Sequence, residues 1–153
     1  MRKLIDTMGL KGNRLGLCPE GKGIPVSMSY VNEIKQQDMK ADFTQKWLKA
    51  WNGHNLDEIM EHYSEDIDFV SPIIQKMGID PGGRISDKGK LRAYFSEALQ
   101  KYPDLHFEFY HELTGVGSVV LYYRSVNGSL SAEYMELDGN GKVCKVRAHY
   151  TQV

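Results

Sequence analysis

The stretch SLSAEYMEL, residues 129–137, places one carboxylate, Glu133, inside a run that otherwise has the composition of a β-strand. Because side chains alternate between the two faces of a strand, Ser131, Glu133, Met135 and Leu137 share one face. An acid among apolar residues is either a rim residue that faces water or a buried acid that lines a pocket. A buried carboxyl could give or take a proton in catalysis.

The dipeptide Asn127-Gly128 predicts a tight hairpin between SVVLYYRSV and SLSAEYMEL. With a two-residue turn, Tyr122 faces Glu133 and Arg124 faces Ser131 across the ladder. The acid then has a phenol and a guanidinium as neighbours, as expected of a pocket wall. A solvent-facing salt bridge between Arg124 and Glu133 would give the same pattern, and charged side chains are rarely buried without a partner. Both interpretations stay open on pattern alone.

The other reactive residue types lack the spacings of known catalytic or metal motifs. The histidines show no H-E-x-x-H or paired-cysteine pattern, so we expect no metal site. Ser71 has no G-x-S-x-G context, and the glycines match neither a phosphate-binding loop nor a dinucleotide fingerprint, so we expect no cofactor. Glu133 is therefore the candidate acid or base.

The first half of the chain is predicted to be helical. Phe43, Trp47 and Trp51 recur every four residues, which indicates an amphipathic helix that ends at Asn52-Gly53. Asn55 is placed to cap a second, short helix that runs through Tyr63. The sequence DIDFVSP follows as a short strand ended by a proline.

A loop, a third helix and four strands complete the expected elements. Residues 73–84 are rich in glycine and predict a mobile loop, and Ser86 or Asp87 caps a helix that ends before Pro103. LHFEFYHEL, SVVLYYRSV, SLSAEYMEL and KVCKVRAHYTQV then read as four strands of an antiparallel meander. Three helices packed into a curved antiparallel sheet make an α+β domain.

Length and composition fit one soluble domain of 153 residues with a formal net charge of −1. This balance argues against nucleic-acid binding, and no apolar run is long enough to span a membrane. Residues 1–28 are basic and rich in glycine, and we interpret them as a leader of unknown role before a single domain over 29–153. Without a recognisable signal peptide, a cytoplasmic location is expected.

Three segments carry a resemblance to a known family: WLKAWNGHNLDEIMEHYSEDIDFVSP, GRISDKGKLRAYFSEAL and YMELDGNGKVCKVRAHY. Together they resemble the nuclear transport factor 2-like superfamily, nearest its SnoaL-like polyketide cyclase and ketosteroid isomerase branch, from about Asp42 to Tyr150. The resemblance implies a cone-shaped α+β barrel with a deep apolar cavity. It also implies a homodimer through the outer sheet face, where strand parity places Lys145, Arg147 and His149.

The resemblance also maps catalytic positions onto this chain. Glu133 falls where isomerases of the family keep an acid that can donate a hydrogen bond to an oxyanion. Ser71 stands at the position of the isomerase base and Trp47 at that of the phenol donor, so two of three catalytic groups are replaced. Related cyclases and epoxide hydrolases carry an acid where this chain has Ala148.

We therefore expect a small apolar ligand and proton-transfer chemistry of isomerase, cyclase or hydrolase type on a hydrophobic carbonyl or polycyclic compound. Glu133 would be the acid or base, with Tyr122 or Tyr63 as the hydrogen-bond donor to the substrate oxygen. A non-catalytic ligand-binding or dimerisation module is the alternative. The expected ligand contacts are Trp47, Phe69, Ser71, Phe95, Arg124, Met135, Val146 and Tyr150.

Overall fold

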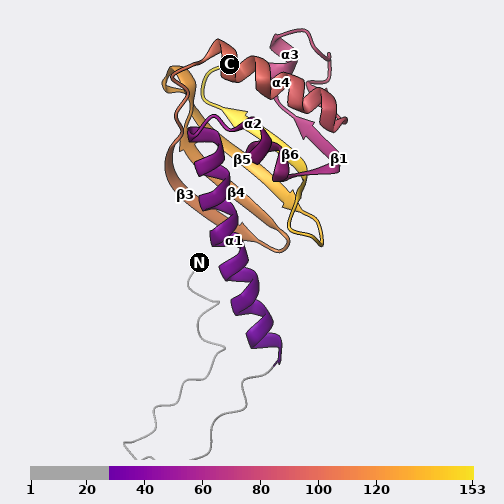
Figure 1. Ribbon diagram of the computed structural model, residues 1–153, viewed down its shortest axis with the longest axis vertical. Coiled ribbons are helices and arrows are strands. Elements are labelled where there is room, and N and C mark those ends of the chain that lie inside the picture. The colour runs from indigo at the N-terminus through magenta and orange to yellow at the C-terminus, as the bar shows by residue number, and fades with distance from the viewer. Residues whose placement is uncertain (1–27) are drawn as a thin grey trace, which may run out of the picture.

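The computed structural model describes residues 28–153, without the side chains of residue 30 and residues 33–41. The predicted leader, apart from Met28, lies outside the described residues. The helices begin at α1 (Met28–Asn52), followed by α2 (Leu56–Glu61) and, later, α4 (Lys88–Lys101). Figure 1 shows α1 running along the sheet, with its first turns projecting beyond it.

Two predicted helix caps are confirmed by their hydrogen bonds. The Asn55 side chain accepts from the backbone N–H of Glu58 at 3.2 Å at the start of α2. The Asp87 carboxylate accepts from the N–H of Lys90 at 2.7 Å at the start of α4. Each cap satisfies a backbone donor that has no partner within its helix, which fixes where the helix begins.

The loop predicted over residues 73–84 is wrong in part, because it contains regular structure at both ends. A short helix, α3 (Pro72–Lys76), begins after Ser71, whose hydroxyl accepts from the N–H of Ile73 at 3.2 Å. Proline is well suited to the first helical position, where its missing N–H costs nothing. A two-residue strand, β2 (Arg84–Ile85), ends the segment. With α3, residues 28–153 contain four α-helices.

The predicted meander is present as β3 (Glu108–Gly115), β4 (Ser118–Arg124), β5 (Leu130–Leu137) and β6 (Val143–Tyr150). Strand β1 (Tyr63–Val70) pairs with β6 in parallel and with β2 in antiparallel orientation. The sheet order is β2-β1-β6-β5-β4-β3. Tyr63 thus begins a strand, and its expected place in the second helix is wrong.

The β4–β5 register differs by one residue from the prediction. Asn127 and Gly128 do form a tight turn, with φ of 56° and 71°. However, Ser125 pairs with Ser129, so Val126 is an additional residue in the connection. Leu121 therefore faces Glu133, and the expected Tyr122–Glu133 pair does not form.

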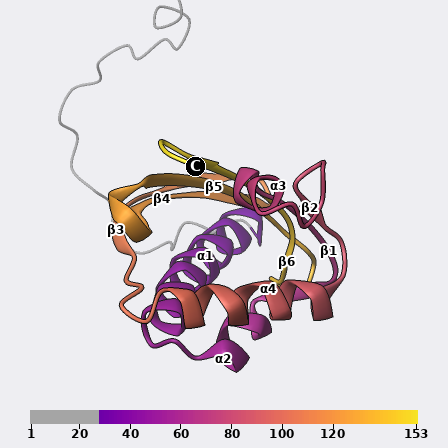
Figure 2. The ribbon, with the colours of Figure 1, turned by 90° about the horizontal axis from the view of Figure 1, so that it is seen from above.

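The sheet is curved and open, and it wraps around α1, while α2 and α4 also lie on its concave side (Figure 2). This is the α+β cone expected from the sequence. Apolar side chains that fill the concave side are fully buried: Ile59, Ile74, Leu91, Val119, Leu121, Met135, Val143 and Val146. In β5, Ser131, Glu133 and Met135 are buried, so the period of two is confirmed.

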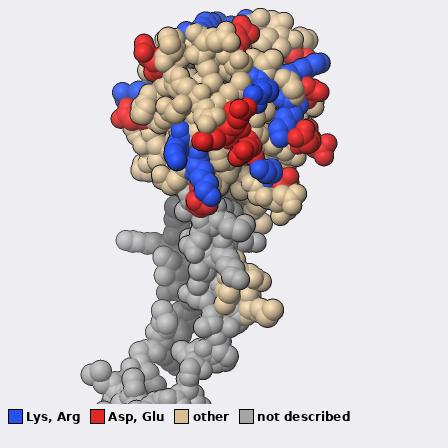
Figure 3. All heavy atoms as spheres, in the orientation of Figure 1, with Lys and Arg blue, Asp and Glu red and all other residues tan. Residues whose placement is uncertain are grey.

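Positive and negative side chains are interspersed on the face shown in Figure 3, without a stripe of one sign. Nucleic-acid surfaces usually gather lysine and arginine on one face, so this face lacks that electrostatic signature. None of the helices within residues 28–153 is long and apolar enough to cross a membrane.

Candidate active site

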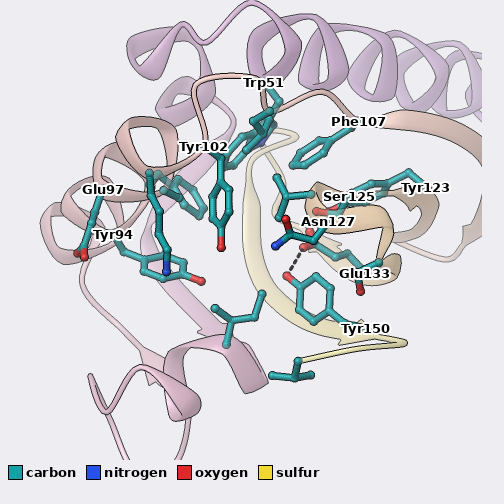
Figure 4. A pocket seen from close by; sticks show the side chains of 18 of the residues that line it. Trp51, Tyr94, Glu97, Tyr102, Phe107, Tyr123, Ser125, Asn127, Glu133 and Tyr150 are labelled. Carbon is teal, nitrogen blue, oxygen red and sulfur yellow. Dashed lines mark hydrogen bonds between the residues drawn. The ribbon is translucent and has the colours of Figure 1, made fainter.

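A cavity of about 570 Å³ lies between the concave side of the sheet and helices α3 and α4. Ten of the 24 residues of its wall are aromatic, and Figure 4 shows side chains that surround the cavity. The rings come from Trp47, Trp51, Tyr63, Phe69, Tyr94, Phe95, Tyr102, Phe107, Tyr123 and Tyr150. A space of this size and character suits a small apolar ligand.

Glu133 reaches this cavity from β5 and is only 5% exposed, so it is the buried acid and not a rim residue. Its Oε1 accepts a hydrogen bond from the hydroxyl of Tyr150 at 3.3 Å. Burial raises the pKa of Glu133 to about 7, although the hydroxyls of Tyr123 and Tyr150 oppose that rise by stabilising the charged carboxylate. The carboxyl can therefore gain or lose a proton near neutral pH.

Tyr63 lies at the start of β1, is 1% exposed and also borders the cavity. Its oxygen accepts a hydrogen bond from Nε1 of Trp47 at 3.1 Å. Burial, reinforced by the charge of Glu133, raises the pKa of Tyr63 far above its ordinary value. The phenol therefore stays protonated, as a hydrogen-bond donor must.

Three charged side chains other than Glu133 also border the cavity. Lys76 from α3 and Glu97 and Lys101 from α4 border it. The ammonium of Lys101 lies 5.5 Å from the centre of the Tyr102 ring, a cation–π distance. These exposed side chains form a polar rim around an aromatic interior.

Most of the predicted site residues come together at the cavity. Glu133 and Tyr63 border it with four of the expected contacts, which are Trp47, Phe69, Phe95 and Tyr150. Met135 and Val146 point to the same side of the sheet but are fully buried core residues that do not border the cavity. Ser71 is also absent from the wall and lies behind it, 1% exposed.

Tyr122 and Arg124 are not brought to Glu133, because the one-residue register shift turns Tyr122 to the outer face. There its ring lies 5.6 Å from that of Tyr110. Arg124, at the exposed end of β4, pairs with Glu108 at 3.7 Å. The expected neighbours of Glu133 are thus replaced by Tyr123 and Tyr150.

Sequence reasoning missed several wall residues, chiefly Tyr94, Tyr102, Phe107, Tyr123 and Asn127. Tyr94 lies on α4 and Tyr102 directly follows its last residue. The three-residue step from Leu91 to Tyr94 could have marked Tyr94 as part of the apolar face. Tyr123 follows from the correct register. For Phe107 the alternation in LHFEFYHEL was the available signal.

Within residues 28–153, no group of three or more histidine, cysteine, aspartate or glutamate side chains could hold a metal ion. The arrangement offers instead a proton-exchanging carboxyl, phenol donors and an apolar binding space.

The comparisons with known proteins agree with this fold. The model of the SnoaL-like domain family matches residues 44–151. A SnoaL-like protein of unknown function from Burkholderia thailandensis is 38% identical, with a TM-score of 0.71, over 75% of this chain and 97% of that one. No curated protein matches the chain.

More distant solved structures share the fold alone. A candidate ketosteroid isomerase from Kribbella flavida is 17% identical, with a TM-score of 0.60, over 76% of this chain and 80% of that one. A candidate polyketide cyclase from Streptomyces antibioticus is 12% identical, with a TM-score of 0.60, over 72% of this chain and 91% of that one.

Proposed function

The chain belongs to the SnoaL-like family, and on that premise we propose that it is an enzyme that transfers a proton on a small hydrophobic carbonyl or polycyclic compound. Glu133 is the acid or base. The observation that carries the proposal is a buried carboxyl with a pKa of about 7 at an aromatic cavity. A group whose pKa lies near the working pH serves as both acid and base.

The four phenols around Glu133 support a role for hydrogen bonding at the substrate oxygen. Burial keeps the pKa of Tyr63, Tyr123 and Tyr150 well above 10, and that of Tyr94 rises to about 12. All four are therefore protonated donors at neutral pH. Tyr63 remains the proposed donor to the substrate oxygen. The Tyr63 hydroxyl accepts a hydrogen bond from Trp47, which leaves its own proton for the substrate, whereas Tyr123 and Tyr150 interact with Glu133.

The test is a thermal-shift screen of the wild type and Glu133→Gln against steroids, aromatic polyketides, terpenoids and terpenoid epoxides, followed by product analysis of every hit. A ligand at a hundred times its dissociation constant adds about 2.7 kcal/mol to the free energy of unfolding. We expect a hit to be converted by the wild type and recovered unchanged with Glu133→Gln. Hits that both proteins bind and neither converts would contradict the enzyme and favour a ligand-binding module.

The proposal includes a homodimer formed through the outer sheet face. The rings of Tyr110 and Tyr122 lie in contact there at a tilt of 51°, and Leu113 on β3 is 63% exposed. Aromatic and apolar side chains of this kind are common in interfaces. Light scattering of the wild type and of Tyr122→Lys tests this: the wild type is expected to have the mass of a dimer and the variant that of a monomer.

A cytoplasmic location completes the proposal. It is supported by Cys144, a free and partly buried thiol on β6, because reducing compartments preserve free thiols. Fractionation of the source cells tests it, and recovery from a secreted fraction would contradict it.

A further inference from the structure

Glu133 is a buried carboxyl without a cationic partner. It is 5% exposed and forms no ion pair with any residue that the structure describes. Arg124, its expected partner, pairs with Glu108 instead. The Tyr150 hydroxyl, which donates to the carboxyl at 3.3 Å, carries no charge. Buried acids are normally paired with a cation or bound to a metal ion, so the missing countercharge requires an explanation.

The neighbours of Glu133 on the two adjacent strands are aliphatic or aromatic. Its direct partners across the ladders are Leu121 on β4 and Ala148 on β6. Tyr123 and Tyr150, each two residues from these partners, occupy the diagonal positions on the same face of the sheet. Figure 4 shows the carboxyl between the rings of these two tyrosines. Two π systems from opposite sides therefore flank the acid.

Further rings continue this wall around the space that the carboxyl faces. The ring of Phe107 lies 4.6 Å from that of Tyr123 and 5.6 Å from that of Trp47, and all three border the cavity. The face of an aromatic ring carries partial negative charge and attracts cations. A carboxylate and the faces of surrounding rings therefore attract positive charge into one cavity.

The three charged side chains of the rim act on such a cation in opposite directions. Lys76 and Lys101 repel it, and Glu97 attracts it. All three are exposed, so water and salt screen their charges. The charge of Glu133 is buried, where the effective dielectric constant is lower and the same charge acts more strongly. Glu133 therefore dominates the electrostatic field inside the cavity.

We propose that the cavity binds an organic cation with an apolar body, a quaternary ammonium or a protonated amine, and that Glu133 is its ion-pair partner. The positive group lies beside the carboxylate between Tyr123 and Tyr150, and the apolar body fills the rest of the space of about 570 Å³. Such a ligand supplies the countercharge that the protein itself lacks. An uncharged ligand of the same shape does not.

This inference adds a charge to the class of compound in the proposed function, and it rests on that function only for its catalytic consequence. A cation next to a carboxyl favours the ionised form. With the ligand bound, Glu133 therefore starts a reaction as a base, which accepts a proton from the compound, and not as an acid.

Phenyltrimethylammonium and tert-butylbenzene are matched probes, because they have nearly the same shape and differ by a permanent positive charge. Both tryptophans of the chain, Trp47 and Trp51, border the cavity, so quenching of their fluorescence reports binding. Because the pKa of Glu133 is about 7, the carboxylate fraction rises about tenfold between pH 6 and pH 8. Over this range the dissociation constant of phenyltrimethylammonium should fall about tenfold, and that of tert-butylbenzene should not fall.

The other groups near Glu133 do not titrate in this range. Burial raises the pKa of four phenols that act on or near the carboxyl, so these phenols stay neutral up to pH 8: Tyr63 from β1, Tyr94 from α4, Tyr123 from β4 and Tyr150 from β6. Among residues 28–153, no histidine borders the cavity. A change in affinity between pH 6 and pH 8 therefore reports Glu133.

Two variants remove the same charge from different parts of the cavity. Glu133→Gln should weaken the binding of phenyltrimethylammonium at pH 8 by at least about tenfold and abolish its pH dependence, because the buried partner is lost. Glu97→Gln removes an exposed charge from the rim, so it should change the affinity by less than about threefold and keep the pH dependence.

The titration of Glu133, followed by the ¹³C signal of its carboxyl carbon, decides the question in the wild type even if Glu133→Gln fails to fold. Because binding and protonation are linked, saturating phenyltrimethylammonium should lower the midpoint from about 7 to below about 6. Saturating tert-butylbenzene should leave the midpoint unchanged or raise it.

Failure of phenyltrimethylammonium to bind, or binding that leaves the Glu133 midpoint unchanged, would overturn the proposal. Neither probe carries a carbonyl group or is converted by proton transfer. The outcome is therefore independent of the proposed function, whose own test is the conversion of a hit into product.

Discussion

The Tyr150 hydroxyl donates to Oε1 of Glu133 across 3.3 Å from a diagonal position on the neighbouring strand. Ser131 pairs with Tyr150 and Glu133 pairs with Ala148 in the β5–β6 ladder. Side chains two residues apart across a ladder are within reach when one of them is long. The small Ala148 opposite Glu133 leaves the space through which Tyr150 reaches the carboxyl.

The pH dependence of stability should carry the signature of Glu133. Its pKa is raised from 4.5 to about 7 in the folded protein, so between those values the folded state binds more protons than the unfolded state. Its contribution is fully present below pH 4.5 and is lost as the pH rises through about 7. The loss is roughly 3 kcal/mol, from 1.36 kcal/mol per pKa unit.

Urea unfolding of the wild type and Glu133→Gln at pH 5 and pH 8 measures this loss. The glutamine does not titrate, so the variant should gain relative to the wild type as the pH rises. A difference between the two proteins that stays constant from pH 5 to pH 8 would show that Glu133 titrates normally and is not held in an apolar site.

Two adjacent tyrosines on β4 provide a matched test of the register. Tyr123→Phe removes a hydroxyl that stabilises the charged form of Glu133, so the pKa of Glu133 should rise above about 7. Tyr122→Phe makes the same change on the outer face and should leave that pKa where it is. The ¹³C titration of Glu133 distinguishes the two, and the opposite result would restore the register with a two-residue turn.

The β4–β5 register could not be predicted from the sequence pattern. The alternation in SLSAEYMEL placed Ser131, Glu133 and Met135 on one face but left open whether that face is buried, and in the structure all three are buried. In SVVLYYR both parities are apolar or aromatic, so a shift of one residue leaves the pattern unchanged. The Asn127-Gly128 turn was recognised, but the additional Val126 carries no local signal.

The remaining differences come from contacts between distant segments. The parallel pairing of Val70 with Arg147 joins strands from the two halves of the chain, and no local periodicity encodes it. Ser71 was identified only through the family position of a base, whereas its backbone N–H is held by the Gly83 carbonyl, twelve residues further along the chain. Local patterns therefore predicted three of the four helices within residues 28–153, two of the helix caps and the candidate acid, and tertiary packing determined the partners of the acid.

Gly83 should be required for the position of Ser71. The Ser71 N–H donates to the Gly83 carbonyl at 2.9 Å, and Gly83 has a φ of +67°. A Cβ at Gly83 would lie 2.7 Å from the Ser71 carbonyl oxygen, which is a steric overlap. Gly83→Ala should lower the free energy of unfolding by about 1–3 kcal/mol.

Gly139→Ala is the control for this substitution, because a Cβ there would have no atom within 4 Å. Its effect should stay within about 0.5 kcal/mol. Denaturant unfolding of both variants measures the contrast, and equal stabilities would mean that the segment after α3 shifts freely to accommodate the side chain.

The two tryptophans of α1 should differ in what their indole N–H groups contribute. Nε1 of Trp47 donates to Tyr63 at 3.1 Å. Nε1 of Trp51 is also buried, and it lowers the pKa of the Tyr63 hydroxyl. However, it has no hydrogen-bond partner among the described residues. Both rings border the cavity, and they are 1% and 5% exposed. Replacement by phenylalanine thus removes similar volume but only one good hydrogen bond.

Trp47→Phe should therefore destabilise the protein more than Trp51→Phe, by about 1–3 kcal/mol, the cost of leaving a buried polar group without its partner. Chemical unfolding followed by circular dichroism measures both variants without relying on the fluorescence that the substitutions remove. Adding Tyr63→Phe should abolish the difference, since the acceptor is then gone from both backgrounds. A difference that persists in the double variants would assign it to ring packing and leave the Trp47–Tyr63 hydrogen bond without a measurable role.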